Sequence, residues 1–302
     1  MVKRTILVEN KATINARNLQ LQIKTEEREA QIPIEDIGFL VIDNSEVQIS
    51  ITALNLLVEN NTATIICGKN HLPNGMFLNL NSHHIQQEIF KNQINASEPL
   101  KKNLWQQTVR EKILNQGILL EKINGKKNHF PFLAEKVKSG DSTNMEGVAA
   151  AEFWRNLPLS PSKGVGYESI KRERFGEYPN NFLNYGYAIL RAATARALSG
   201  SGLLNTLGIH HKSKYNAFAL ADDIMEPFRP MIDEKVYQLT QIYQEQELNT
   251  FLKKELVSVL TQTVYFEEIK SPLMVALQKV ASSLQQCYTG KRRKINYPKL
   301  WN

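Results

Sequence analysis

The sequence lacks the residues from which several common kinds of functional site are built. Its two cysteines, Cys67 and Cys287, are too few for a disulfide framework or a zinc cage. It has no glycine-rich phosphate-binding loop, so the use of ATP is not indicated. No serine–histidine or cysteine–histidine pattern of a nucleophilic enzyme stands out either. The remaining candidates for a functional site are acidic residues and histidines.

Long hydrophobic runs are also missing. No apolar run reaches the roughly 18 residues that a membrane-spanning helix requires. The first residues, MVKRTILVENKATINARN, have charges among their apolar positions, unlike a signal peptide. We therefore expect a cytoplasmic protein without a membrane segment.

Charge is distributed unevenly along the chain. Residues 1–80 hold 7 Lys/Arg and 9 Asp/Glu, a net charge of −2, whereas residues 81–302 hold the other 30 and 21, a net charge of +9. A polyanion such as nucleic acid would therefore bind to the second part. The alternative is an ordinary solvated basic surface.

The pattern of hydrophobic residues changes near residue 85. The first part reads as short strands, with one helix over ITALNLLVENN (51–61) and a turn at HLPNG (71–75). Later segments have the 3.6-residue period of helices. We predict an α+β protein, with a β-sandwich-like domain over residues 1–85 and a larger all-α domain over residues 86–302. The helices are expected over residues 84–95, 100–124, 144–157, 181–199, 217–228, 232–247, 252–263 and 272–289.

An acidic cluster lies within an otherwise apolar helical segment. Glu226 lies three residues after Asp223 and four after Asp222, so either of these side chains can share a helix face with it. Like charges at this spacing repel one another, and a divalent cation relieves the repulsion. The alternative is a solvated acidic face that pairs with Arg229. Carboxylates with one imidazole suit Mg²⁺ or Mn²⁺, and such a metal can activate a phosphodiester toward attack.

Two adjacent histidines, His210 and His211, precede this cluster. Only one can point inward if the segment is extended, because successive side chains alternate. A third candidate, Glu146, begins a small apolar helix. The pair Thr143 and Glu146 also fits a capping box, which would explain the acid without any catalytic role.

The segment 178–198, YPNNFLNYGYAILRAATARAL, holds further polar groups on a helix. Asn181 can cap it, and Asn184 and Tyr187 would lie in its first turns. Arg191 and Arg196 follow. Ordinary capping and core packing explain these residues equally well.

Taken in order, four segments resemble the CRISPR adaptation integrase, the larger of the two core spacer-acquisition proteins. They are IPIEDIGFLVIDNSEVQISITALNLLVENNTATIICGKNHLPNG, NMEGVAAAEFW, NNFLNYGYAILRA, and LGIHH followed by LADDIMEPFRP. The segments LGIHH and IMEPFRP are most similar to the type II form of this family.

The resemblance implies a set of metal ligands. They fall on Glu146, His211 and Glu226, which would also be the catalytic residues, with Asp223 as a further acidic ligand. His211 is preferred to His210 because fifteen residues then separate it from Glu226, and Asp222 is a spare candidate.

The resemblance also implies an activity and partners. The protein would insert short DNA spacers into a CRISPR array by transesterification, as a homodimer assembled with a small companion protein. The type II form makes the effector nuclease of that system a candidate partner. Two other functions stay open: a general metal-dependent nuclease on branched DNA in repair, and a non-catalytic DNA-binding scaffold. Candidates for phosphate contacts are Lys163, Lys171, Arg172, Arg174, Lys291, Arg292 and Arg293.

Overall fold

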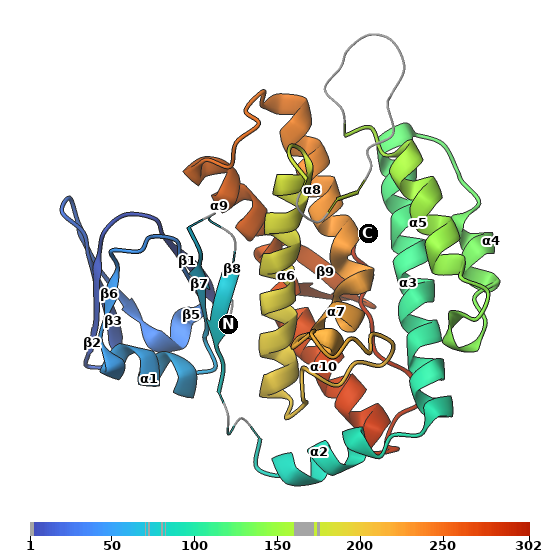
Figure 1. Cartoon of the computed structure of the whole chain (residues 1–302), viewed down its shortest axis with the longest axis horizontal. Helices are drawn as coiled ribbons and strands as arrows, with labels where there is room; N and C mark the ends of the chain where they lie inside the picture. Colours follow the sequence, from blue (N-terminus) through green and yellow to red (C-terminus); the bar gives the residue numbers. More distant parts are fainter. Residues whose placement is uncertain are drawn as a thin grey trace.

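The computed structural model describes residues 3–69, 71, 73–79, 81, 83–159, 172–173 and 176–302. Two four-stranded sheets form the N-terminal part, and helices pack beside them (Figure 1). The first sheet has the order β1 (Arg4–Val8), β5 (Ile37–Ile42), β7 (Ala63–Cys67), β8 (Pro73–Phe77). The second has the order β4 (Glu29–Pro33), β3 (Gln20–Lys24), β2 (Thr13–Arg17), β6 (Gln48–Ile49).

Strand β5 is the centre of the N-terminal part. It pairs in parallel with both β1 and β7, and all six of its residues are buried. A strand covered on both faces needs a continuous apolar run, which IGFLVI supplies. Leu40 and Ile42 join the core that both sheets share with α1 (Ile51–Glu59). Phe39 and Val41 face the other way and join the core of the helices.

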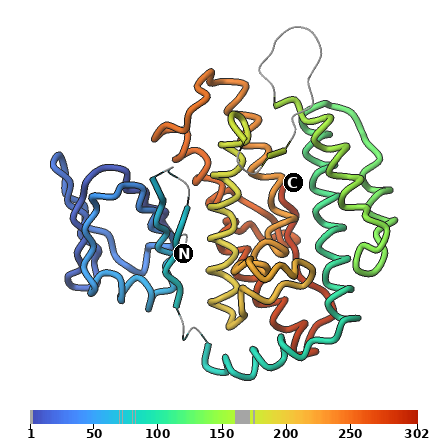
Figure 2. Tube along the Cα trace, in the orientation of Figure 1, coloured from blue at the N-terminus to red at the C-terminus, as the bar shows by residue number. Residues whose placement is uncertain are grey.

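The remaining helices form the larger part of the molecule. The tube in Figure 2 shows the chain leaving the strands and entering α2 at one edge before the other helices follow. They are α2 (Gln86–Ile94), α3 (Glu98–Asn124), α4 (Phe130–Glu135), α5 (Met145–Asn156), α6 (Asn180–Gly200), α7 (Ala219–Met225), α8 (Arg229–Ile242), α9 (Thr250–Ser258) and α10 (Leu273–Tyr288). Short 3₁₀ turns are η1 (Ile34–Asp36), η2 (Ser139–Asp141), η3 (Glu226–Phe228) and η4 (Val259–Thr261).

Helix α6 is the central helix of this part. It packs against β7, β8, α7, α8, α9 and α10, and most of its residues are buried. Small residues permit this close packing. A side chain at Gly186 would come within 2.5 Å of the Ile232 methyl group on α8, so only glycine allows the two helices to approach this closely.

Two sequence predictions about secondary structure are wrong. The second part is not all-α, because β9 (Thr263–Phe266) and β10 (Ile269–Pro272) form an antiparallel hairpin between α9 and α10. The helix expected over residues 252–263 ends at Ser258. The run TVYF has the β-branched and aromatic residues that favour a strand. The expected turn over residues 71–75 is partly strand β8, which pairs with the edge of β7.

Among the described residues, no helix is long and apolar enough to cross a membrane.

Candidate active site

Two of the predicted acidic residues meet around one positive charge. The Nζ atom of Lys112, on α3, lies 2.6 Å from Oε1 of Glu146, on α5, and 2.6 Å from Oε2 of Glu226, on η3. The side chains of Lys112 and Glu226 are 10% and 4% exposed. Three elements that are distant in sequence thus bring two carboxylates to one cation position.

The first turn of α5 sets the position of Glu146. Asp141 accepts the backbone N–H of Met145 at 2.8 Å and of Glu146 at 3.0 Å, so its carboxylate satisfies two amides at the start of the helix. Thr143 instead directs its hydroxyl to the carbonyl of Lys136. The capping-box interpretation is therefore wrong. The carboxylate of Glu146 is left for the contact with Lys112.

Glu226 is a buried carboxylate between two cations. Oε1 lies 2.9 Å from Nη2 of Arg229, and Oε2 faces Lys112. Burial alone would raise the pKa of Glu226, but the charges of Arg229 and Lys112 outweigh it and hold the pKa below its ordinary value. The expected pairing with Arg229 is present, yet Glu226 is in the core rather than on a solvated face. Oε2 makes no hydrogen bond of normal geometry despite its ion-pair contact.

Asp223 positions His211 and the loop that carries it. Its carboxylate is fully buried and accepts the backbone N–H of Ile209 at 2.6 Å and of His210 at 2.9 Å. It also contacts Nδ1 of His211 at 2.5 Å, and this hydrogen bond raises the pKa of His211. A side chain at Gly208 would collide with this carboxylate, since its Cβ would lie 2.8 Å from Oδ2.

The two histidines take different roles. His210 stacks flat on Trp105 of α3, with ring centroids 4.4 Å apart and an interplanar angle of 3°. His211 meets the same ring edge-on, and its side chain is 44% exposed. With Nδ1 directed to a carboxylate, Nε2 of His211 is the nitrogen available to a ligand, the usual arrangement of a metal-binding histidine.

Asp222 is directed away from these residues. Its carboxylate binds Nε of Arg191 at 2.5 Å and Nη2 at 3.0 Å, and it accepts Nδ2 of Asn216 at 2.8 Å. The three acids that were expected to converge therefore have separate partners. Asp222 pairs with Arg191, Asp223 orients His211, and Glu226 contacts Lys112.

The polar residues expected on α6 also serve the fold. Asn181 does not cap the helix, which begins at Asn180, and its Nδ2 donates to the carbonyl of Gln246 at 2.8 Å. Asn184 accepts a hydrogen bond from Arg172 at 2.6 Å. Arg196 donates to the carbonyl of Asn61 and so joins α6 to the N-terminal part.

Tyr187 belongs to a buried network behind Glu226. Its hydroxyl donates to Asp233, and the guanidinium of Arg229 lies 4.9 Å from the centre of its ring. Burial raises the pKa of Asp233 to about 7, although Tyr187 and Arg229 act in the opposite direction. Arg229 is thus held on one side by Tyr187 and on the other by Glu226.

Lys112 was not singled out from the sequence. It belongs to a stripe of buried polar side chains at helical spacing on α3, and that stripe is the signal that could have identified it. The stripe consists of Thr108, Lys112, Asn115 and Gln116.

The types of donor present suit a divalent cation. Two carboxylates and an imidazole are the donor types that Mn²⁺ and Mg²⁺ sites use, and Oε2 of Glu226 has a lone pair without a directional partner. In the part of the chain that the structure describes, no three acidic, histidine or cysteine side chains already lie close enough together to hold a metal. Lys112 occupies the space between Glu146 and Glu226 instead.

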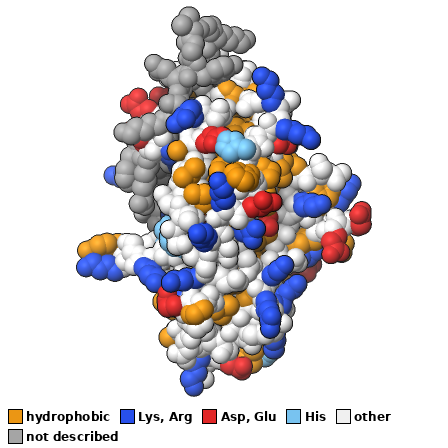
Figure 3. Space-filling model, turned by 90° about the vertical axis from the view of Figure 1, so that its right-hand side faces the viewer, with side chains coloured by type: hydrophobic (Ala, Val, Ile, Leu, Met, Phe, Trp, Pro, Cys, Tyr) orange, Lys and Arg blue, Asp and Glu red, His pale blue; other side chains and the backbone are white. Residues whose placement is uncertain are grey.

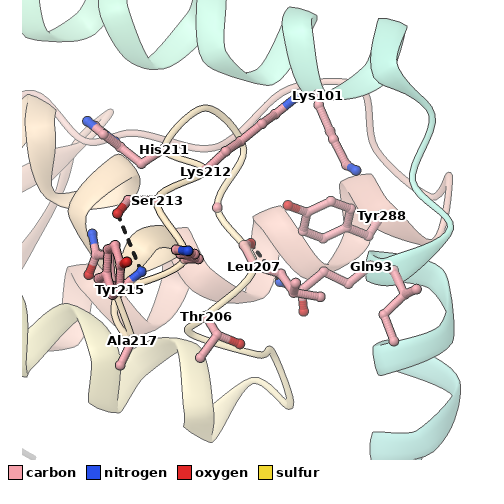
Figure 4. A pocket seen from close by; sticks show the side chains of 14 residues that line it. Gln93, Lys101, Thr206, Leu207, His211, Lys212, Ser213, Tyr215, Ala217 and Tyr288 are labelled. Carbon is pink, nitrogen blue, oxygen red and sulfur yellow. Dashed lines mark hydrogen bonds between the residues drawn. The ribbon is translucent and has the colours of Figure 1, made fainter.

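A basic cavity of about 710 Å³ opens beside His211. Figure 4 shows the loop after Leu207 forming one wall, with Lys101 and Tyr288 reaching in from helices. Tyr215 lines it and is 86% exposed. Lysines beside an exposed aromatic ring are suited to phosphates and bases.

The basic residues of the tail form a second surface. Arg292, Arg293 and Lys294 are exposed and line a cavity with Arg110 of α3. Gln107 holds the tail in place by donating to the carbonyl of Arg293 at 3.1 Å. Figure 3 shows Lys and Arg side chains spread over the face on the α3 side. Of the other predicted phosphate contacts, Lys163, Lys171 and Arg174 lie outside the described residues.

Comparisons with known proteins agree on one family. The family model described as CRISPR associated protein Cas1 matches residues 5–265. The chain is 35% identical over 301 residues to the CRISPR-associated endonuclease Cas1 of Neisseria meningitidis serogroup C, covering 97% of this chain and 95% of the relative. It is 26% identical to the CRISPR-associated endonuclease Cas1 2 of Saccharolobus solfataricus, covering 77% and 73%.

Solved structures show the same fold at low sequence identity. A casposase bound to integration product superposes with a TM-score of 0.79 at 19% identity, over 98% of this chain and 93% of that one. A Cas1 protein from Thermotoga maritima gives a TM-score of 0.76 at 16% identity, over 95% and 97%. From the family model and the near full-length relative, the chain belongs to the Cas1 family of CRISPR-associated proteins.

Proposed function

We propose that this chain is a metal-dependent DNA endonuclease and integrase that inserts short DNA spacers into a CRISPR array by transesterification. The observation that carries the proposal is the meeting of Glu146 and Glu226 at one cation position in a Cas1-family chain. His211, which Asp223 orients, is close enough for its charge to help lower the pKa of Glu226. The Neisseria relative is named an endonuclease, and one structural neighbour is a casposase bound to integration product. Both names support the proposed chemistry.

Glu146, Glu226 and His211 would hold the metal, Mg²⁺ or Mn²⁺. When bound, such an ion supplies positive charge to a phosphate oxygen and lowers the pKa of a coordinated hydroxyl. Asp223 was expected to be a fourth ligand, but its oxygens bind the loop amides and His211. We assign Asp223 the role of orienting His211.

The reaction exchanges one phosphodiester for another. The 3′-hydroxyl oxygen of the short DNA bonds to a phosphorus of the repeat, the existing bond from that phosphorus to the 3′ oxygen breaks, and a proton moves from the attacking hydroxyl to the leaving oxygen. Arg229 is fixed beside Glu226 and adds positive charge near the scissile phosphate. His211 serves either as a ligand or near the leaving oxygen.

We assign residues 1–85 to dimerisation and residues 86–302 to catalysis and DNA binding. A homodimer, the small companion protein and the type II effector nuclease are the proposed protein partners. Similar folds occur in a Cas6-RT-Cas1–Cas2 complex and in a TtCas1-DNA complex, which supports assembly with a companion and with DNA. Because the target is a chromosomal array, we place the protein in the cytoplasm.

The test is integration of a labelled short DNA duplex into a plasmid that carries a CRISPR repeat, with the companion protein and Mn²⁺. Wild type is compared with Glu226→Gln and with the matched control Glu234→Gln, an acid of α8 that pairs with Lys122 outside the site. Joined product from wild type and the control, but not from Glu226→Gln, is the expected result.

Other results would favour the alternatives. Cleavage of branched DNA without any joining would identify a general nuclease. DNA binding without joining or cutting by any of the three proteins would identify a scaffold.

A further inference from the structure

The pair of carboxylates in the proposed metal site is already bridged by a cation of the protein's own. Lys112 reaches Glu146 and Glu226 at 2.6 Å each. The contact with Glu226 is buried and only weakly screened by water, whereas the side chain of Glu146 is 22% exposed.

A divalent cation could not share this position with the ammonium group. Mg²⁺ binds carboxylate oxygens at about 2.1 Å, closer than a lysine nitrogen approaches them. Two positive charges at such a separation, away from water, repel each other strongly. Either Lys112 or the metal can lie between Glu146 and Glu226, but not both.

Of the two cations beside Glu226, Lys112 is the more easily displaced from that carboxylate, although it also donates a hydrogen bond to Glu146. Arg229 contacts Oε1 at 2.9 Å and is held from behind by the ring of Tyr187. Lys112 contacts Oε2, which has no hydrogen bond of normal geometry. A lysine side chain has four flexible methylene links and can swing without moving its helix.

We propose that Lys112 is a positioning residue that stands in for the metal: it holds Glu146 and Glu226 together when no metal is bound and is displaced when metal binds. This inference rests on the proposed function, because it takes these carboxylates as metal ligands. The arrangement keeps two buried carboxylates from repelling each other in the metal-free protein. It also weakens metal binding, because the metal must displace an ion pair.

The test measures Mn²⁺ binding and thermal unfolding of the full chain, without reference to activity. Lys112→Met removes the charge and keeps most of the side-chain volume. We expect its Kd for Mn²⁺, by calorimetry, to be at least about tenfold lower than that of wild type, a change worth about 1.4 kcal/mol. We also expect a lower Tm in the metal-free state, with the difference from wild type reduced at saturating Mn²⁺.

The matched control is Lys235→Met, a lysine of similar exposure that pairs with Glu255 at 3.0 Å away from the site. It should change the Tm but not the Kd for Mn²⁺. A merely structural Lys112 would behave like this control, and an unchanged or higher Kd in Lys112→Met would overturn the proposal. If wild type and variant alike bind no Mn²⁺, the metal site of the proposed function is overturned as well.

If Lys112→Met does not fold, the wild-type protein still provides the test. The ¹⁵Nζ signal of Lys112, assigned by its absence from Lys112→Arg, should shift as Mg²⁺ is added. A signal that stays in place while calorimetry detects Mg²⁺ binding that Glu226→Gln abolishes would show that Lys112 is not displaced.

Discussion

The Nδ1 atom of His211 lies 2.5 Å from Oδ1 of Asp223, a carboxylate that is fully buried. The same carboxylate accepts the backbone N–H groups of Ile209 and His210. Asp223 therefore determines both the path of the loop and the orientation of the imidazole. Asp222, its neighbour in sequence, instead accepts hydrogen bonds from Arg191 and Asn216.

The first prediction follows from this difference. Asp223→Asn should lower integration activity by about 10–100-fold, the usual cost of losing a residue that orients a metal ligand. Asp222→Asn should cost much less, because it alters a pairing with Arg191 outside the metal ligands. Integration rates at saturating Mn²⁺ provide the measurement. Equal losses in the two variants would contradict the role assigned to Asp223.

The second prediction concerns the start of α5. Asp141→Ala removes the acceptor for the amides of Met145 and Glu146 and should lower the free energy of unfolding by about 1 kcal/mol, the usual cost of removing a cap. Thr143→Ala should leave it nearly unchanged, since Thr143 caps no amide of α5. Urea unfolding of both variants measures the difference. A larger effect at Thr143 would restore the capping-box interpretation.

The third prediction concerns a buried ion pair between the N-terminal sheet and α9. Nζ of Lys253 lies 2.5 Å from Oδ2 of Asp43, and the side chains are 5% and 1% exposed. Lys253→Met leaves Asp43 without this cation and should destabilise the protein by about 3–5 kcal/mol. The control is Lys254→Met, an exposed neighbour on the same helix. Chemical denaturation should show a large shift for Lys253→Met and almost none for the control.

The fourth prediction is a pH dependence of stability. Burial raises the pKa of Asp233 from 3.8 to about 7, so the folded protein binds a proton that the unfolded chain releases at lower pH. The contribution of this group to stability therefore falls as the pH rises from about 4 to about 7 and is constant above that range. Asp233→Asn lacks the effect.

We therefore measure the Tm of wild type minus the Tm of Asp233→Asn from pH 5 to 8. This quantity should fall as the pH rises to about 7 and then stay constant. A difference that is independent of pH would show that Asp233 is ionised in the fold.

The fifth prediction concerns DNA binding by the tail. Replacing Arg292, Arg293 and Lys294 with Gln should weaken DNA binding and reduce the slope of log K against log salt by about 0.9 for every phosphate of duplex DNA that the tail no longer neutralises. Fluorescence anisotropy at several salt concentrations gives the slope. The matched control replaces three exposed basic residues of the N-terminal part, Lys11, Arg17 and Lys24. An equal reduction in both variants would show that the tail is no preferred binding surface for DNA.

Local pattern was sufficient for most of the secondary structure and for the family. The strands of IGFLVID and TATIICG and the helices of the second part were predictable, because hydrophobic period and capping depend on neighbours in sequence. The hairpin of β9 and β10 was missed, because a short apolar run fits either a helix end or a strand. Glu146, His211 and Glu226 were grouped as one set only through the family resemblance, since no local pattern joins segments so far apart.

How those residues are used depends on contacts between distant segments. From the sequence, Asp222, Asp223 and Glu226 form one acidic cluster. In the fold, Arg191, the 209–211 loop and Lys112 each take one of them, since a buried carboxylate must find a donor or a cation wherever packing places one. In the sequence, Lys112 is one of four lysines on α3. Only the packing of α3 against α5 and η3 gives it two carboxylate partners. Burial then strengthens the attraction between these charges, and neither effect can be read from neighbours in sequence.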